Sequence, residues 1–215
     1  MPVDPPREGG GPNPPFGEDF FQRIVNVHWG VEVVVRGFDP DTTVNASLSN
    51  NNLTATHTNT TTNSGARVRL THNAGKYYFE IKVGVHDISE MIGLILASSS
   101  YAVLMAFIAT NGNVNVNNVF YGNIGSFLFV DDVTGIAVDF DAGLVWFRVN
   151  AGTWYGSGTG NPETGIGGAP FPAGSALSPC IGFGVAASAG STVTGNFGDT
   201  AYANPAPSGF NSWYE

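Results

Sequence analysis

Side chains that could do acid–base chemistry are few and scattered in this sequence of 215 residues. Hydrolysis of a glycosidic bond requires two carboxyl groups that flank the bond, and the pattern Glu-x-Asp-x-x-Glu does not occur. Glu80 lies two positions from Lys82, on what we predict to be the solvated face of a strand. The sequence therefore predicts no catalytic pair of carboxylates.

Asp139 and Asp141 are spaced so that both carboxylates would share one face of an extended strand. Ala142-Gly143 follows at once, and Asp is common at such turns, so turn capping is favoured over acid–base or metal chemistry. Asp131-Asp132 could add oxygen ligands for calcium, but the spacing of an EF-hand is absent. We predict no metal site and no cofactor.

The histidines give no sign of a catalytic or zinc site. They are far apart in sequence, without a close pair, and no Gly-x-Ser-x-Gly turn precedes a predicted helix. We therefore predict a protein without catalytic machinery. The four histidines are His28, His57, His72 and His86.

Aromatic side chains on predicted loops offer a binding site of another kind. Aromatic rings stack on sugars and dominate the hot spots of protein interfaces at low entropic cost. The structural alternative is that Trp154 simply caps one end of a β-sandwich. The predicted ligand- or partner-binding residues are Tyr101, Tyr121, Asn123, Trp154 and Tyr155.

The composition favours a β protein with an acidic, largely neutral-polar surface. Hydrophobic residues make up 42% of the chain and charged residues 12%, with 29 Gly and 13 Pro, which suits many short strands joined by tight turns. The formal charge is −9, and Lys76 and Lys82 are the only lysines, so nucleic acid is a poor partner. Cys180, the single cysteine, excludes an intrachain disulfide and is expected to be a buried apolar side chain.

Two further signals bear on location. The first residues lack the basic and apolar regions of a secretory signal, which predicts synthesis in the cytoplasm. The longest apolar run, residues 101–109, is about half the ~20 residues that a membrane-spanning helix needs. No membrane insertion is predicted.

The chain divides into three parts. Residues 1–17 contain six prolines and a Gly run, which predicts a flexible arm. Residues 18–37 are either an extra strand on the domain's own sheet, which we favour, or an anchor that docks onto another protein. Residues 38–215 form the main domain. The candidate anchoring side chains are Phe20, Phe21, Ile24, Val25 and Trp29.

From residue 38 onward the hydrophobic pattern has a period of two. Residues 76–85 alternate between apolar and polar faces, which predicts a strand with one buried and one solvated side. Residues 144–149 alternate too, and the turn residues 139–143 before them predict an antiparallel hairpin. Residues 150–168 are predicted to form a long surface loop. Further strands are predicted at residues 53–58, 66–71, 91–97, 101–109, 114–121, 181–187 and 192–197, of which 91–97 and 101–109 should be covered on both faces or contact a partner.

The ordered set of motifs resembles the SPRY domain family over about 175 residues. The resemblance implies an all-β fold, a two-sheet antiparallel β-sandwich of the concanavalin A-like class, that acts as a binding module. The matching segments are Phe38-Asp-Pro-Asp with residues 48–56, Gly75-Lys-Tyr-Tyr-Phe-Glu80, residues 132–139 followed by 144–150, Pro179, Asn196-Phe-Gly198 and Pro207-Ser-Gly-Phe210.

Residues 161–168 are similar to the bacterial and bacteriophage branch, whose members occur on tail and other surface proteins. Three departures stand out. The apolar run 101–109 replaces a polar, aromatic-bearing stretch, Phe38 replaces the family's opening tryptophan, and Thr134 replaces an aliphatic residue. The first departure puts inherited ligand contacts in that run in doubt.

These observations predict a non-enzymatic bacteriophage virion surface protein, tail-associated or capsid-decorating and present in many copies. Residues 1–37 would bind other virion proteins, and the sandwich would face a host-surface glycan or protein. The alternatives are a free carbohydrate-binding, lectin-like module and a glycoside hydrolase, for which we find no carboxylate pair.

Overall fold

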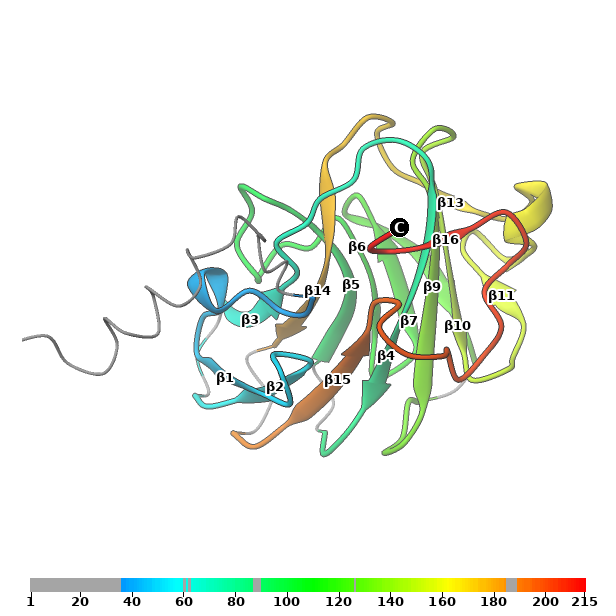
Figure 1. Cartoon of the computed structure of the whole chain (residues 1–215). Helices are drawn as coiled ribbons and strands as arrows, with labels where there is room; N and C mark the ends of the chain where they lie inside the picture. The colour runs from blue at the N-terminus through cyan, green and yellow to red at the C-terminus, as the bar shows by residue number, and fades with distance from the viewer. Residues whose placement is uncertain (1–35, 60, 62, 87–89, 126, 185–188) are drawn as a thin grey trace, which may run out of the picture. The chain divides into compact units, whose positions relative to one another are not determined.

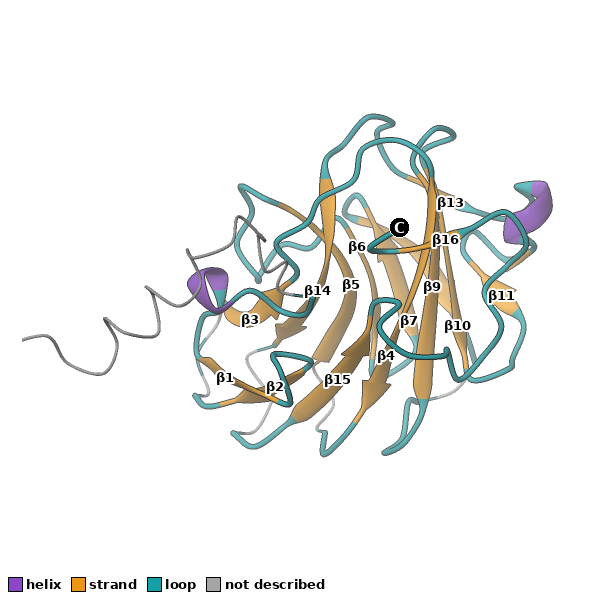
Figure 2. Ribbon diagram, in the orientation of Figure 1, coloured by secondary structure: helices purple, strands orange, loops and turns teal. Residues whose placement is uncertain are grey.

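Two layers of strands, each mainly antiparallel, form the fold (Figures 1 and 2). The computed structural model describes residues 36–59, 61, 63–86, 90–125, 127–184 and 189–215, which lie in a compact unit spanning Val35–Glu215. The predicted arm and all five candidate anchoring residues lie outside the described residues. Two 3-10 turns, η1 (Pro40–Thr42) and η2 (Pro162–Thr164), are the helical elements of the described part.

The first sheet has the strand order β1-β2-β15-β4-β9-β10-β11-β12, with β13 beside β10 and β16 parallel to β4. The second has the order β3-β14-β5-β6-β7-β8. The first-sheet bounds are β1 (Ala46–Ser49), β2 (Thr54–His57), β4 (Lys76–Val83), β9 (Val133–Asp139), β10 (Leu144–Val149), β11 (Trp154–Tyr155), β12 (Thr159–Gly160), β13 (Ala169–Pro170), β15 (Thr192–Asn196) and β16 (Asn211–Ser212); the second-sheet bounds are β3 (Ser64–Arg67), β5 (Glu90–Leu96), β6 (Ala106–Ala109), β7 (Asn113–Val116), β8 (Val119–Asn123) and β14 (Leu177–Phe183).

The main core lies between the two sheets. Phe79, Ile136 and Phe147 enter it from the first sheet, and Ile92 and Ile181 enter it from the second, all fully buried. Burying an aliphatic or aromatic side chain contributes about 1.5–3 kcal/mol to folding. The period-two pattern of the sequence therefore places the core as predicted, and the two-sheet sandwich is confirmed.

The predicted hairpin is confirmed. β9 and β10 pair with Asp139 opposite Leu144, and the Asp139 carboxylate accepts a hydrogen bond from the Ala142 backbone N–H at 2.9 Å. Asp141 accepts one from the Gly75 backbone N–H at 3.0 Å. Both carboxylates thus serve turns, as predicted, and Asp139 also pairs with Lys76 at 3.0 Å.

Two strand predictions need correction, and the predicted long loop at residues 150–168 contains β11, β12 and η2. Residues 114–121 are not one strand, because a turn at Asn117 and Asn118, both with positive φ, separates β7 from β8. In residues 101–109, only Ala106–Ala109 is a strand. Tyr101 and Leu104 instead lie in a loop and pack on Ile95, outside the main core. The apolar run is long because it covers the outer face of the second sheet, so β5 is buried on both faces as predicted.

The predicted solvated face of β4 is wrong at its centre, although Lys82 at its end is exposed. Tyr78 is fully buried and Glu80 is 2% exposed. The C-terminal segment, red in Figure 1, crosses over this face. The Glu80 carboxylate accepts hydrogen bonds from the backbone N–H groups of Ala203 (2.7 Å) and Asn204 (2.8 Å) and from the Tyr78 hydroxyl (2.7 Å). A carboxylate with these donors is the anchor that holds the C-terminal segment on the sheet.

The same segment ends in a second anchor. Trp213 is fully buried in the main core, its indole N–H donates to the Leu70 carbonyl at 3.1 Å, and its own carbonyl lies 2.8 Å from Nε2 of His72. The His72 ring stacks on Tyr77, with 3.7 Å between the ring centroids. Burial lowers the pKa of His72, and its hydrogen bond to Trp213 opposes that effect.

The first described residues contact the C-terminus. Gly37 donates its backbone N–H to the Tyr214 hydroxyl at 3.0 Å. Arg36 pairs with Asp199 at 3.4 Å, and its guanidinium lies 5.6 Å from the centre of the Tyr214 ring. The two ends of the compact unit therefore lie next to each other.

Substituting Glu80 should destabilise the whole fold. In Glu80→Ala four donors, the fourth being the Asn204 side-chain amide, lose their acceptor in a buried site, which we expect to lower the free energy of unfolding by about 3 kcal/mol in urea titration. The control is Lys82→Ala, since Lys82 is 52% exposed and pairs with the exposed Asp131. This control should change stability by less than about 0.5 kcal/mol. Equal effects from both variants would contradict the anchoring role of Glu80.

Stability should fall as the pH is lowered through the titration of His72. Its folded-state pKa lies below the ordinary value of 6.5, so the unfolded chain binds the proton more readily. The contribution of neutral His72 is complete above pH 6.5 and is lost as the pH falls from there toward the lowered folded pKa. Urea midpoints measured across this range should drop less in His72→Gln, which keeps a donor toward Trp213. Identical pH profiles of the native chain and His72→Gln would show that His72 does not cause the loss of stability.

Candidate functional site

A groove of about 600 Å³ opens where the connection from β8 to β9 meets β11. Apolar walls come from Ile124, Phe129, Trp154 and Tyr155. Its polar residues include Asp132, Asn150 and Thr153. This combination of aromatic walls and a few polar groups is typical of ligand and partner sites.

The Trp154 ring is in contact with a buried arginine. Arg148, on β10, is 9% exposed, and its guanidinium carbon lies 4.3 Å from the centre of the Trp154 ring. Arg148 also donates to the Tyr78 hydroxyl at 3.1 Å and to the Pro205 carbonyl. The Tyr78 hydroxyl in turn donates to Glu80, and burial raises its pKa well above the usual value, so it stays protonated. The anchor of the C-terminal segment thus also supports the groove.

Three apolar residues beside the groove are strongly exposed. Phe127, Phe129 and Val130 are 57%, 63% and 56% exposed. Between them Leu128 is fully buried, and its backbone N–H donates to the Thr110 carbonyl at 2.8 Å. The loop therefore presents its aromatic side chains because Leu128 ties its centre to the core.

Asp132 fixes the far end of this loop. One carboxylate oxygen accepts from the Phe129 backbone N–H at 2.7 Å, and the other accepts from the side-chain amide of Asn150 at 2.8 Å. The Asn150 side-chain carbonyl accepts from the Val133 N–H at 2.9 Å. The two loops that border the groove are thereby joined by a continuous set of hydrogen bonds.

Four of the five predicted binding residues lie in or next to the groove. Trp154 and Tyr155 line it. The Tyr155 hydroxyl donates to the Tyr121 carbonyl at 3.1 Å, which ties β11 to β8. Asn123, next to Ile124, donates to the Asn111 carbonyl at 2.8 Å and is a turn-stabilising residue in this structure. Ligand contact by these residues stays a prediction.

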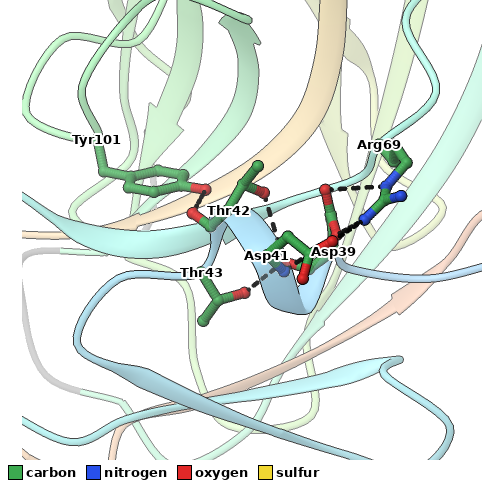
Figure 3. A network of polar contacts seen from close by, with 6 residues as sticks. All are labelled: Asp39, Asp41, Thr42, Thr43, Arg69 and Tyr101. Carbon is green, nitrogen blue, oxygen red and sulfur yellow. Dashed lines mark hydrogen bonds and ion pairs between the residues drawn. The ribbon is translucent and has the colours of Figure 1, made fainter. Parts of the chain in front are cut away.

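Tyr101 does not join them. Its ring is 4% exposed, and its hydroxyl donates to the Thr42 carbonyl at 2.7 Å (Figure 3). Burial raises the pKa of Tyr101 to about 12. Figure 3 shows the same turn, η1, held by Arg69, which pairs with both Asp39 and Asp41. Tyr101 is therefore part of the packing under η1.

The pair of Arg69 and Asp39 is a fixed structural contact. Two guanidinium nitrogens donate to the two Asp39 oxygens at 3.1 and 2.7 Å. Partial burial would raise the pKa of Asp39, but the hydrogen bonds from Arg69 and from the Asp41 N–H outweigh it and hold that pKa below its usual range. Such a bidentate pair explains why the family-like Phe38-Asp opening lies against the segment after β3.

Sequence reasoning missed the exposed loop and the charged groups at the groove. Phe127, Phe129 and Val130 were not predicted, although Phe-Leu-Phe at 127–129 has the alternation that places Leu128 inside, and Asp132 was considered only as a calcium ligand. Arg148 gave no signal at all, because its burial depends on a C-terminal segment 57 residues away.

The described residues give no sign of a metal centre. Within them, no group of three or more His, Cys, Asp or Glu side chains could hold an ion. The longest helical elements there are single 3-10 turns, so none could span a membrane. Cys180 is a buried free thiol, as predicted.

No protein-family model matches the chain, and no curated protein matches it. Among solved structures, the SPRY domain of human HERC1 is similar to it, with a TM-score of 0.60 and 15% sequence identity. The match covers 77% of this chain and 100% of the HERC1 domain. The chain has a SPRY-type fold. The SPRY-like sandwich predicted from the ordered motifs is thereby confirmed at the level of the fold.

Proposed function

We propose that the SPRY-type sandwich is a non-enzymatic module that binds a protein partner through the groove and the loop beside it. The carrying observation is the exposure of Phe127, Phe129 and Val130, each more than half accessible, next to the aromatic wall of Trp154. Exposed apolar residues gathered at one place on a soluble protein are typical of interaction sites. Aromatic side chains that become buried when the partner binds would then supply most of the binding energy.

The loop that carries the exposed apolar side chains is held in place before a partner binds. Leu128 holds its centre in the core, and Asp132 ties its end to Asn150. A surface that is already fixed loses little conformational entropy when a partner docks. The arrangement supports recognition by a preformed surface.

A carbohydrate ligand is the second candidate, because Trp154 with Asn150 and Asp132 has the residue types of a sugar site. The hydrogen bonding favours a protein instead. Asn150 uses both its side-chain oxygen and its nitrogen on the loops, and both Asp132 oxygens already accept hydrogen bonds. These polar side chains thus mainly fix the loops of the groove, whereas the exposed apolar side chains beside it match a protein partner better than sugar hydroxyl groups.

The test is selection of binders from a random peptide library on the full chain, with a glycan array in parallel. Peptides that bind should lose at least about tenfold in affinity with Phe129→Ala and with Trp154→Ala. The control, Val103→Ala, removes an apolar residue that is 51% exposed and does not line this groove. Selected peptides that are indifferent to both groove variants would refute the site, and glycan binding that these variants abolish would favour the lectin alternative.

We further propose, on the sequence resemblance to the bacteriophage branch, that the module is displayed in many copies on a virion surface. Residues 1–35 would bind other virion proteins, and the groove would meet a host-surface protein or glycan. Weak single sites would then act together through avidity. Absence of the protein from purified particles would contradict this proposal.

Removal of the N-terminal residues should separate folding from assembly. A chain starting at Arg36 keeps the contacts of Arg36 and Gly37 with Tyr214, so it should stay folded and monomeric. The full chain should form larger assemblies in light scattering, with circular dichroism as the check on folding. Equal sizes for the two chains would speak against an anchoring role for residues 1–35.

A further inference from the structure

The groove carries a negative charge that the described residues do not neutralise. Asp132 is the charged residue of its lining, and among the described residues no Lys, Arg or His lies within 4.0 Å of its carboxylate. Both hydrogen bonds that it accepts come from neutral groups, the Phe129 N–H and the Asn150 amide. The neighbouring Asp131 differs, since it pairs with Lys82 at 2.7 Å.

The geometry of Asp132 leaves it able to accept more. A carboxylate has about four lone-pair positions, and two are used here. The same two hydrogen bonds hold the carboxylate in one place at the edge of the groove. A cationic donor could therefore bind it without first ordering the side chain.

The Trp154 ring favours an apolar partner group, because a positive charge already lies over it. The guanidinium of Arg148 already lies over one face of the indole, 4.3 Å from its centre. A second cation on the opposite face would gain less from the ring and would be repelled by Arg148. An apolar or aromatic side chain against Trp154 and Phe129 meets no such penalty.

We propose that the groove binds an extended protein segment with a lysine or arginine next to an apolar or aromatic side chain, the basic group at Asp132 and the apolar group on Trp154. This inference rests on the proposed function and names the partner's chemistry. The chain's net charge of −9 would add long-range attraction for such a segment.

The experiment uses the labelled full chain on an array of glycine-flanked dipeptides in which both central positions run through all amino acids. Dense spots add avidity, which makes weak contacts measurable. Pairs that combine Lys or Arg with an aromatic or aliphatic residue should give the strongest signal. Enrichment of acidic pairs, or of apolar pairs without a basic residue, would overturn the proposal.

The affinity of the peptide with the best pair is then measured in solution. It is compared with that of an analogue in which norleucine replaces the basic residue, which keeps an apolar stem and removes the charge. We expect the analogue to bind about three- to tenfold more weakly to the native chain. Asp132→Asn should reduce the affinity of the basic peptide by a larger factor than that of the analogue, because the amide also weakens the hydrogen bonds to Phe129 and Asn150 that both peptides depend on. A double-mutant cycle on these four affinities measures the contact itself.

The matched control is Asp131→Asn, which changes the net charge equally but removes a carboxylate that pairs with Lys82. It should leave the affinity of the basic peptide within about twofold. An equal loss of affinity in both Asp variants would show that only the net charge matters, and would overturn the proposed contact with Asp132. If Phe129→Ala abolishes binding while Asp132→Asn and the norleucine analogue have no effect, the binding module stands and the proposed charge contact fails.

Discussion

The buried carboxylate of Glu80 is the contact on which both the fold and the groove depend. Its backbone donors fix the C-terminal segment over β4, and the Tyr78 hydroxyl connects it to Arg148. Arg148 in turn lies over the Trp154 ring. Glu80 and Arg148 are thus opposite charges bridged by a neutral hydroxyl, so the fold tolerates both in a buried layer without a direct ion pair. The same hydrogen-bonded group thus holds the C-terminal segment on the first sheet and contacts Trp154 of the groove.

Much of the architecture follows from local pattern. The alternation in residues 76–83 and 144–149, and the turn at 139–143, were sufficient to predict β4 and the hairpin of β9 and β10, but not that β4 lies on the other side of β9. The order of the motifs was sufficient to predict the two-sheet sandwich. Of the candidate site, Trp154 and Tyr155 were predicted from residue type and loop position. These features depend on neighbours within a few residues or on one strand pair.

What failed depends on contacts between distant segments. Glu80 looked solvated because polar residues alternate with apolar ones, and only residues 203–204, more than a hundred positions later, bury it. Tyr101 looked like a loop aromatic, yet it covers the outer face of the second sheet beneath η1. In both places a segment without regular structure acts as a third layer. A period-two pattern assigns one face of each strand to the core and the other face to water. The assignment fails wherever a loop covers the outer face of a sheet.

The contact of Arg36 and Gly37 with Tyr214 has an architectural consequence. A module whose first and last residues meet can be inserted into a surface loop of another protein with little more disturbance than a short hairpin. It can equally well be cut open at an exposed turn and rejoined across its original ends.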